Sequence, residues 1–234
     1  CLVIAHACSV HVASTLLKRR DILRFMTGVE TSGVMRADAR RNRRRLLDAA
    51  IELILEVGTE PSRDAIAKRA GVGIGTLYRH FPDRDELLRA VVLDVLDRTI
   101  ERGNSAREES PSGSEALRRY AHAAIDTGLG VVSILRPLLD TPNWPDRHAA
   151  AHQLLDRLIE TARSDDAIDA DVTATDIALA TIRFCRPLAI GLDPATERAT
   201  AHRQLDVYLD GLMSRPNMTR RTGLEADSPR FDPE

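Results

Sequence analysis

The sequence has few aromatic residues, no long apolar run and none of the common catalytic motifs. Aromatic residues make up 3% of its 234 residues, and no run of eighteen apolar residues occurs. The first absence disfavours a core built from sheet, and the second leaves no predicted membrane-spanning helix. We also find no glycine-rich phosphate loop, no zinc-binding spacing and no hydrolase-like order of Ser, His and Asp. We therefore predict no enzymatic activity, no catalytic residue, no metal site, no cofactor and no membrane partner.

Cysteine is scarce as well. Cys1, Cys8 and Cys185 are an odd number without paired spacing, which argues against a disulfide framework and favours a reducing, cytoplasmic location. We expect Cys185 to be a buried structural thiol, with redox sensing as the alternative. His6 and His11 lie near Cys8, but their spacings match no zinc template, so we interpret the group as chance.

The composition that remains favours helices. Hydrophobic residues make up 43% of the chain, Ala and Leu are abundant, and β-branched residues are scattered rather than alternating. This pattern predicts an all-α fold. The net charge of −2 conceals a gradient, because residues 36–89 contain 12 Lys or Arg and 9 Asp or Glu, whereas residues 90–234 contain 17 and 24. We expect the basic end to contact nucleic acid.

The stretch at residues 65–81, AIAKRAGVGIGTLYRHF, indicates two short helices joined by a glycine turn. Gly71 stands where the first helix must end, because a residue without a Cβ adopts the left-handed conformation at little cost. Leu77 and Phe81 are spaced i, i+4 and are expected to face inward. The residues left to face outward on the second helix are Thr76, Tyr78, Arg79 and His80. This is the pattern of a helix-turn-helix whose second helix reads the major groove; an ordinary helical hairpin is the alternative.

The flanking sequence extends the pattern. A basic helix precedes it, and PDRDELL follows at residues 82–88. From residue 41 to residue 88 the chain resembles the TetR family of bacterial transcriptional regulators, and GTLYRHFP at residues 75–82 is among that family's most specific signals. The resemblance implies an N-terminal three-helix helix-turn-helix DNA-binding domain and a larger C-terminal helical domain that binds a ligand and dimerises. The chain departs from the family at Gly73 and Ile74, where members usually carry Ser or Lys.

Six arginines between residues 36 and 45 form a basic arm that leads into the first helix. Cations at a helix N-terminus oppose its dipole, so we expect phosphates to stabilise them.

Base contacts are assigned mainly to Gly75, Thr76 and Arg79. By resemblance, Tyr78 and His80 are more often phosphate contacts. Ser62 is a candidate N-cap, and an Asp83-x-x-Glu86 capping box would hold Arg84 beside the DNA backbone. The full predicted DNA-binding set is Arg41, Arg43, Arg44, Ser62, Arg63, Gly75, Thr76, Tyr78, Arg79, His80 and Arg84.

Further helices follow along the chain. The fourth is predicted to end near Gly103, with a loop over 104–114. Five more are predicted at about 115–128, 130–139, 145–163, 171–191 and 195–213. The predicted segments are an extension at 1–34 that is poorly ordered or not native, the DNA-binding domain at 35–88, the effector-binding and dimerisation domain at 89–213, and a disordered tail at 214–234.

An effector pocket is expected against the fourth helix. Its predicted lining is Leu96, Leu135, Trp144, His148, Arg183 and Phe184. Trp144 either covers the pocket mouth or packs in the core.

His148 and His152 are spaced as metal ligands can be, but a solvated helix face is our default. Arg183 and Arg186 interrupt an apolar helix, so we expect them to be buried and paired with acids at a subunit interface, or to line a cavity for an anionic ligand.

The resemblance implies a regulator, most simply a repressor that binds a palindromic operator as a homodimer. Its last two helices would form a four-helix bundle with the partner subunit, and a small-molecule effector would release it from double-stranded operator DNA. A helical enzyme or small-molecule carrier that does not bind DNA is the alternative from another class, although no catalytic constellation supports it.

Overall fold

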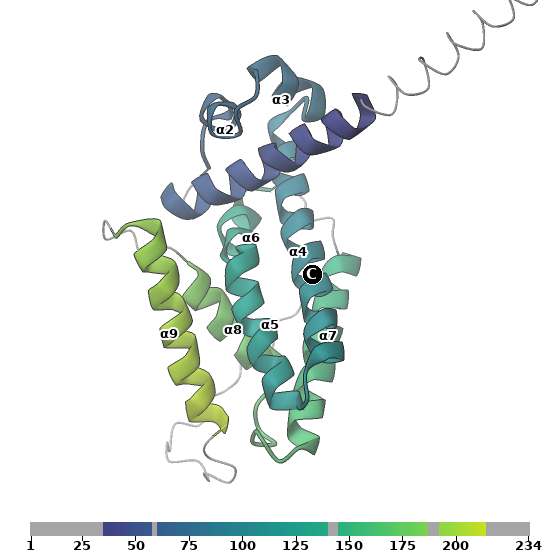
Figure 1. The fold of residues 1–234 in the computed structure, drawn as a ribbon, viewed down its shortest axis with the longest axis vertical. Coiled ribbons are helices and arrows are strands. Elements are labelled where there is room, and N and C mark those ends of the chain that lie inside the picture. The colour runs from purple at the N-terminus through teal and green to yellow at the C-terminus, as the bar shows by residue number, and fades with distance from the viewer. Residues whose placement is uncertain (1–34, 58–59, 140–144, 187–191, 214–234) are drawn as a thin grey trace, which may run out of the picture. The chain divides into compact units, whose positions relative to one another are not determined.

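The computed structural model describes residues 35–57, 60–139, 145–186 and 192–213, and all regular structure within these ranges is helical, as predicted (Figure 1). A first helix covers residues 35–57. The elements that follow are α2 (Arg63–Arg69), α3 (Ile74–His80), α4 (Arg84–Glu109), α5 (Gly113–Thr127), α6 (Gly130–Leu135), a 3-10 turn η1 (Arg136–Leu138), α7 (Pro145–Ser164), α8 (Ala174–Cys185) and α9 (Pro194–Met213). The predicted segments 1–34 and 214–234 lie outside the described residues.

Two compact units make up the described chain. The smaller unit contains the described residues up to Ala49 together with Arg63–His80, and the larger unit contains Ala50–Ser62 and the described residues from Phe81 onward. The first helix therefore contributes residues to both units. This division differs from the predicted boundary at Leu88, because residues 50–62 and 81–88 belong to the larger unit.

The smaller unit buries a compact set of apolar side chains. Leu46 and Leu47 of the first helix, Ile66 and Ala67 of α2, and Leu77 of α3 are all buried. α2 packs against α3, and the buried Ala67 of α2 has a small side chain. None of the described helices is long and apolar enough to cross a membrane.

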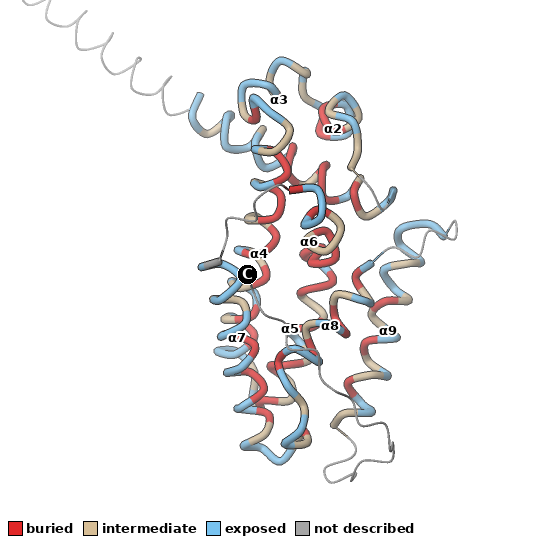
Figure 2. Tube along the Cα trace, turned by 180° about the vertical axis from the view of Figure 1, so that it is seen from behind, coloured by how far each residue is buried: buried red, intermediate tan, exposed pale blue. Residues whose placement is uncertain are grey.

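The larger unit is built on α4, α5 and α7, each of which packs against the other two. Figure 2 shows their buried residues as stripes along each helix. On α4 six apolar side chains form a buried stripe, and Ile100, one turn further along the helix, is partly exposed. The buried members are Leu87, Leu88, Val91, Val92, Val95 and Leu96.

The predicted end of the fourth helix near Gly103 is wrong. α4 continues to Glu109, so most of the expected loop over 104–114 is helix. Gly103 is buried, and a Cβ there would lie 2.6 Å from Leu154 Cδ2 and 2.8 Å from Tyr120 Cδ2. This glycine lets α5 and α7 approach α4 closely, and it does not stop the helix.

Two other predicted helices have different bounds. The helix expected at 130–139 is α6 followed by the 3-10 turn η1, because Pro137 has no N–H to continue an α-helix. The helix expected at 171–191 begins later, at Ala174. Thr173 caps it: its hydroxyl accepts the Asp176 N–H at 3.2 Å, and the Asp176 carboxylate accepts the Thr173 N–H at 2.9 Å. α8 ends at Cys185, and residues 187–191 lie outside the described chain.

Candidate nucleic-acid interface

The turn between α2 and α3 has the predicted glycine geometry. Gly71 has φ +64°, its N–H donates to the Lys68 carbonyl at 3.2 Å, and the Val72 N–H donates to the Ala67 carbonyl at 3.0 Å. An added Cβ at Gly71 would approach nothing closer than Arg45 Nη1 at 3.9 Å. Glycine is therefore favoured here by its left-handed backbone and not by lack of space.

α3 presents one face to the core and the other to solvent. Its first turn is fixed by the Gly73 carbonyl, which accepts the Thr76 N–H at 2.8 Å and the Leu77 N–H at 3.3 Å. Leu77 is fully buried, as predicted, whereas Tyr78 is 46% exposed and Arg79 is exposed. The Arg79 Nε donates to the Gly75 carbonyl at 3.2 Å, so this side chain lies back along its own helix.

Two further glycines lie at the start of α3, Gly73 just before the helix and Gly75 in its first turn. An added Cβ at Gly73 or Gly75 would meet nothing within 4 Å, and neither residue has a positive φ. The fold of the smaller unit therefore does not require glycine at either position. Within a helix, Gly75 even costs about 0.5–1 kcal/mol relative to alanine. These two positions form an open surface that the backbone of another molecule can approach.

Cationic side chains lie on the same unit. Arg41, Arg43 and Arg44 are exposed on the first helix, where Arg41 forms an ion pair with Asp38. The Arg63 guanidinium lies 4.8 Å from the centre of the Tyr78 ring, a cation–π contact that joins the start of α2 to α3. Ser62 is exposed immediately before α2.

His80 ends α3 next to these cations. Burial, followed by the charges of Arg43 and Arg79, lowers the pKa of His80 from its ordinary value of 6.5. The imidazole is therefore mostly neutral at pH 7. In that state it still has one N–H with which to donate a hydrogen bond.

Arg84 has a different environment from the other predicted DNA contacts. Its Nε donates to both Glu60 carboxylate oxygens, at 2.9 and 2.8 Å, and its Nη1 donates to Asp85 at 3.0 Å. The hydrogen bond to Glu60 is the largest cause that raises the pKa of Arg84. Two carboxylates thus already neutralise this guanidinium within the larger unit. The cap predicted beside it is confirmed in part, since the Glu86 N–H donates to Asp83 Oδ1 at 2.7 Å.

The predicted ligand-binding residues differ in how far they are buried. Leu96 and Leu135 are buried in the core, His148 is exposed, and Trp144 lies outside the described residues. Although the His148 side chain is exposed, nearby protein atoms partly desolvate it, and this effect, followed by the charge of Arg136, lowers its pKa. His152 pairs with Asp156 at 3.1 Å on its own helix. In the described ranges, no group of three or more His, Cys, Asp or Glu side chains is placed to hold a metal ion.

The expectation that Arg183 and Arg186 are buried is wrong. Both are exposed in the described chain. The buried stripe of α8 is formed by Ala174, Ile177, Ala180, Thr181 and Cys185, and Arg183 lies off that stripe. The apolar residues beside the two arginines in the sequence do not determine the face on which each arginine lies.

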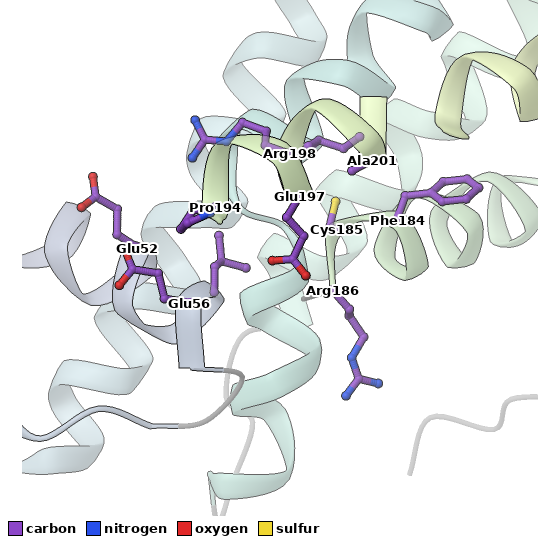
Figure 3. A pocket seen from close by; sticks show the side chains of 11 residues that line it. Glu52, Glu56, Phe184, Cys185, Arg186, Pro194, Glu197, Arg198 and Ala201 are labelled. Atoms are coloured by element: carbon purple, nitrogen blue, oxygen red, sulfur yellow. The ribbon is translucent and has the colours of Figure 1, made fainter. Parts of the chain in front are cut away.

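A small cavity of about 90 Å³ lies within the larger unit (Figure 3). Three carboxylates and two guanidinium groups belong to its wall. The lining residues are Glu52, Leu55, Glu56, Ile125, Phe184, Cys185, Arg186, Pro194, Glu197, Arg198 and Ala201. Among the predicted ligand residues, Phe184 is the one that lines this cavity. Its ring also packs edge-on against Tyr208 of α9, with the ring centres 5.9 Å apart.

Cys185 forms part of the cavity wall. The thiol is buried, as predicted, and burial raises its pKa to about 12. At neutral pH it is a protonated thiol and a poor nucleophile.

These features define a helix-turn-helix DNA-binding protein with a larger helical unit. Residues 46–91 match the family described as bacterial regulatory proteins, tetR family. Across 75% of this chain and 99% of the other, it is 32% identical to the TetR transcriptional regulator SCO0520 from Streptomyces coelicolor, with a TM-score of 0.56. The chain belongs to the TetR family of transcriptional regulators.

Two further comparisons agree with this assignment. A TetR regulator from Mycobacterium vanbaalenii is 29% identical over 76% of this chain and 99% of its own, with a TM-score of 0.56. An HTH-type transcriptional regulator of Staphylococcus aureus (strain USA300) is 39% identical over 85 residues, which are 36% of this chain. That match spans 46% of the S. aureus protein, so the similarity covers about half of its length.

Proposed function

We propose that this chain is a transcriptional repressor that acts in the cytoplasm, binds a palindromic operator as a homodimer, and leaves it when a small-molecule effector binds. Regulators of this family bind operator DNA as dimers, and some bind small molecules. The observation that carries the proposal is the outward face of α3. There, two glycines that the fold does not require lie beside Thr76 and Arg79.

Base recognition is assigned to this face. Gly75 lets the DNA backbone or a base edge approach the helix closely. The Arg79 guanidinium can leave the Gly75 carbonyl and make two hydrogen bonds to guanine, and the Thr76 hydroxyl can bond a neighbouring base.

The remaining predicted residues supply phosphate contacts. Arg41, Arg43, Arg44, Ser62, Arg63, Tyr78 and His80 carry the necessary donors. His80 can act as a neutral donor, so its contact does not require protonation. For Arg84 we propose a positioning role, because a phosphate would have to compete with the Glu60 and Asp85 carboxylates for its guanidinium.

Dimerisation is assigned to α8 and α9. Leu179 on α8 is 49% exposed and Val207 on α9 is 73% exposed, although both are apolar. A two-fold interface would bury each of these side chains against its counterpart region on the partner subunit. Leu179→Glu together with Val207→Glu should convert the dimer to a monomer in analytical ultracentrifugation.

The effector is assigned to the larger unit. Among the predicted ligand residues, Phe184 has the clearest support because it lines the cavity. The cavity is smaller than the roughly 300–1,000 Å³ of ordinary ligand sites, so effector binding would have to open it. In a thermal-shift screen, a small molecule that binds the native state raises the melting temperature. The same molecule should weaken DNA binding over the same concentration range, because coupling between two sites is reciprocal.

DNA binding is tested by fluorescence anisotropy, with labelled DNA from upstream of the protein's own coding region. We expect binding to this DNA to be stronger than to random DNA of equal length. We also expect the logarithm of the association constant to fall linearly with the logarithm of salt concentration. Equal affinity for both DNAs, or affinity that salt does not change, would contradict the proposal.

A further inference from the structure

Two histidines join α5 to α9, which pack side by side in the larger unit (Figure 1). The Nδ1 atoms of His122 on α5 and His202 on α9 lie 2.7 Å apart. Their ring centres lie 5.0 Å apart with an angle of 19° between the planes, so the two rings meet edge to edge at their Nδ1 atoms. Each side chain is 26% exposed, so the pair is partly shielded from solvent. Neither histidine belongs to the proposed DNA-binding surface or lines the cavity.

The outer ring nitrogens face carboxylates. His122 Nε2 lies 2.9 Å from Asp206 Oδ1, and His202 Nε2 lies 3.1 Å from Asp126 Oδ1. An ionised carboxylate can only accept a hydrogen bond, so each ring carries its proton on Nε2. Asp206 also accepts from Arg118 Nη1 at 2.8 Å. The hydrogen bond from His122 is the largest cause that lowers the pKa of Asp206, which favours its ionised form.

The number of protons on the two facing Nδ1 atoms decides whether they attract. If neither carries a proton, two lone pairs face each other at 2.7 Å. If both carry one, two N–H groups and two positive charges face each other. Only a single proton between them gives an Nδ1–H···Nδ1 hydrogen bond, and the pair then has three protons and one positive charge.

We propose that His122 and His202 share one proton and form a pH-dependent clasp that holds α9 against α5. The clasp is strongest where the pair carries a single positive charge, flanked by the carboxylates of Asp126 and Asp206. At lower pH a fourth proton breaks it, and at higher pH the loss of the third proton breaks it. The stabilisation therefore has a maximum between these two conditions.

The other groups near the clasp belong to α5, α8 and α9. Arg118 bridges α5 to Asp206 and Asp210 of α9. On α8, the charge of Asp176 raises the pKa of Tyr208 of α9 and the charge of Arg183 lowers it, after the larger effect of burial. Cys185, also on α8, is a neutral thiol near Asp126. The ion pairs described for α4 and α7 connect residues of those two helices: Asp94 with Arg98, Asp97 with Arg147, Asp156 with His152, and Glu160 with Arg163. Of all these group types, imidazole is the one that ordinarily changes charge between about pH 5 and pH 8.

The test measures melting temperature from pH 5 to pH 9 in the presence of EDTA, for the full chain and its His122→Gln and His202→Gln variants. The difference between the full chain and either variant should amount to several degrees at an intermediate pH and shrink at both ends of the range. His152→Gln is the matched control, because His152 is exposed and pairs with Asp156 on its own helix. Its effect should be small and without a maximum. The readout needs no DNA, so failure of the proposed repressor function would leave it unchanged.

Three outcomes would overturn the clasp. The first is a stability difference that is constant or changes in one direction only from pH 5 to pH 9. The second, measured in a parallel series without EDTA, is a rise in the melting temperature of the full chain with added Zn²⁺ that either variant abolishes, since the two Nδ1 atoms would then be metal ligands. The third uses the unaltered chain and therefore does not depend on how the variants fold: ¹⁵N-histidine NMR that shows no coupling between two Nδ1 atoms across a shared proton at any pH in the range.

Discussion

The two units use glycine in opposite ways. In the smaller unit, a Cβ added at Gly73 or Gly75 would meet nothing within 4 Å. In the larger unit, a Cβ at Gly103, Gly113 or Gly130 would come within 2.6, 2.3 or 2.4 Å of its nearest atom. At these three positions the larger unit has glycine because its own helices touch there, whereas an added Cβ at Gly211 of the same unit would also meet nothing within 4 Å. The smaller unit has glycines that nothing within the unit explains, which is what a surface shaped for an external partner should show.

The largest expected effect is at Gly113. A Cβ there would lie 2.3 Å from the Ala162 backbone nitrogen and 2.4 Å from the Thr161 carbonyl carbon. Backbone atoms cannot rotate away, so Gly113→Ala should lower the free energy of unfolding by about 3 kcal/mol. Urea denaturation measures this. The control is Gly211→Ala on α9, where nothing lies within 4 Å and a gain of about 0.5–1 kcal/mol is expected. Similar changes in the free energy of unfolding for both variants would show that the close contacts around Gly113 do not decide whether a side chain is tolerated there.

The next effect concerns recognition by α3. Arg79→Ala should reduce the preference for operator over random DNA by about 1–3 kcal/mol, because a two-bond contact to a base would be lost. Thr76→Ala should act in the same direction. Lys68→Ala is the control, since Lys68 is exposed on α2 and has no assigned base. It should weaken binding to both DNAs by the same factor. If Arg79→Ala also weakened both DNAs equally, its role would be a phosphate contact.

A smaller and more selective effect is expected at Gly75. Gly75→Ala should raise the free energy of unfolding by about 0.5–1 kcal/mol, because alanine is the better helix former. The same change should weaken operator binding, because the new methyl group would occupy the surface that DNA approaches. Gly211→Ala should give the gain in stability without the loss of binding. A Gly75→Ala variant that is more stable and binds DNA normally would show that close approach is not required.

The smallest effect separates two roles for Arg84. The pair with Glu60 is partly exposed, so Glu60→Gln should change stability by less than about 1 kcal/mol. If Arg84 is a positioning residue, Glu60→Gln should weaken DNA binding as Arg84→Ala does. If Arg84 contacts phosphate, Glu60→Gln should release the guanidinium and strengthen binding to every DNA. Anisotropy titrations of both variants on operator and random DNA distinguish the two results.

The features that could be predicted from the sequence are local ones. The left-handed Gly71, the buried Leu77 and the Asp83 cap each depend on residues within about one helical turn, where backbone hydrogen bonds and conformational preferences decide the outcome. The surface formed by α3 could be predicted for the same reason.

The features that could not be predicted depend on distant residues. Glu60 and Arg84 are 24 positions apart, and His122 and His202 are 80 positions apart. No periodicity in one segment indicates which residue of another will face it. Gly103 was misread because a glycine that ends a helix and a glycine that lets two helices touch look the same in a sequence.

The reaction rate of the buried Cys185 thiol can report how often the larger unit opens. A protonated thiol in the cavity wall can react with a disulfide reagent only during moments when the wall opens. In a variant with Cys1 and Cys8 replaced by serine, the labelling rate would measure the free energy of that opening when closing is fast. It would thus report how often a cavity of about 90 Å³ becomes wide enough for a larger guest. A true effector should slow or hasten this labelling, and therefore a single native cysteine can follow effector entry in solution.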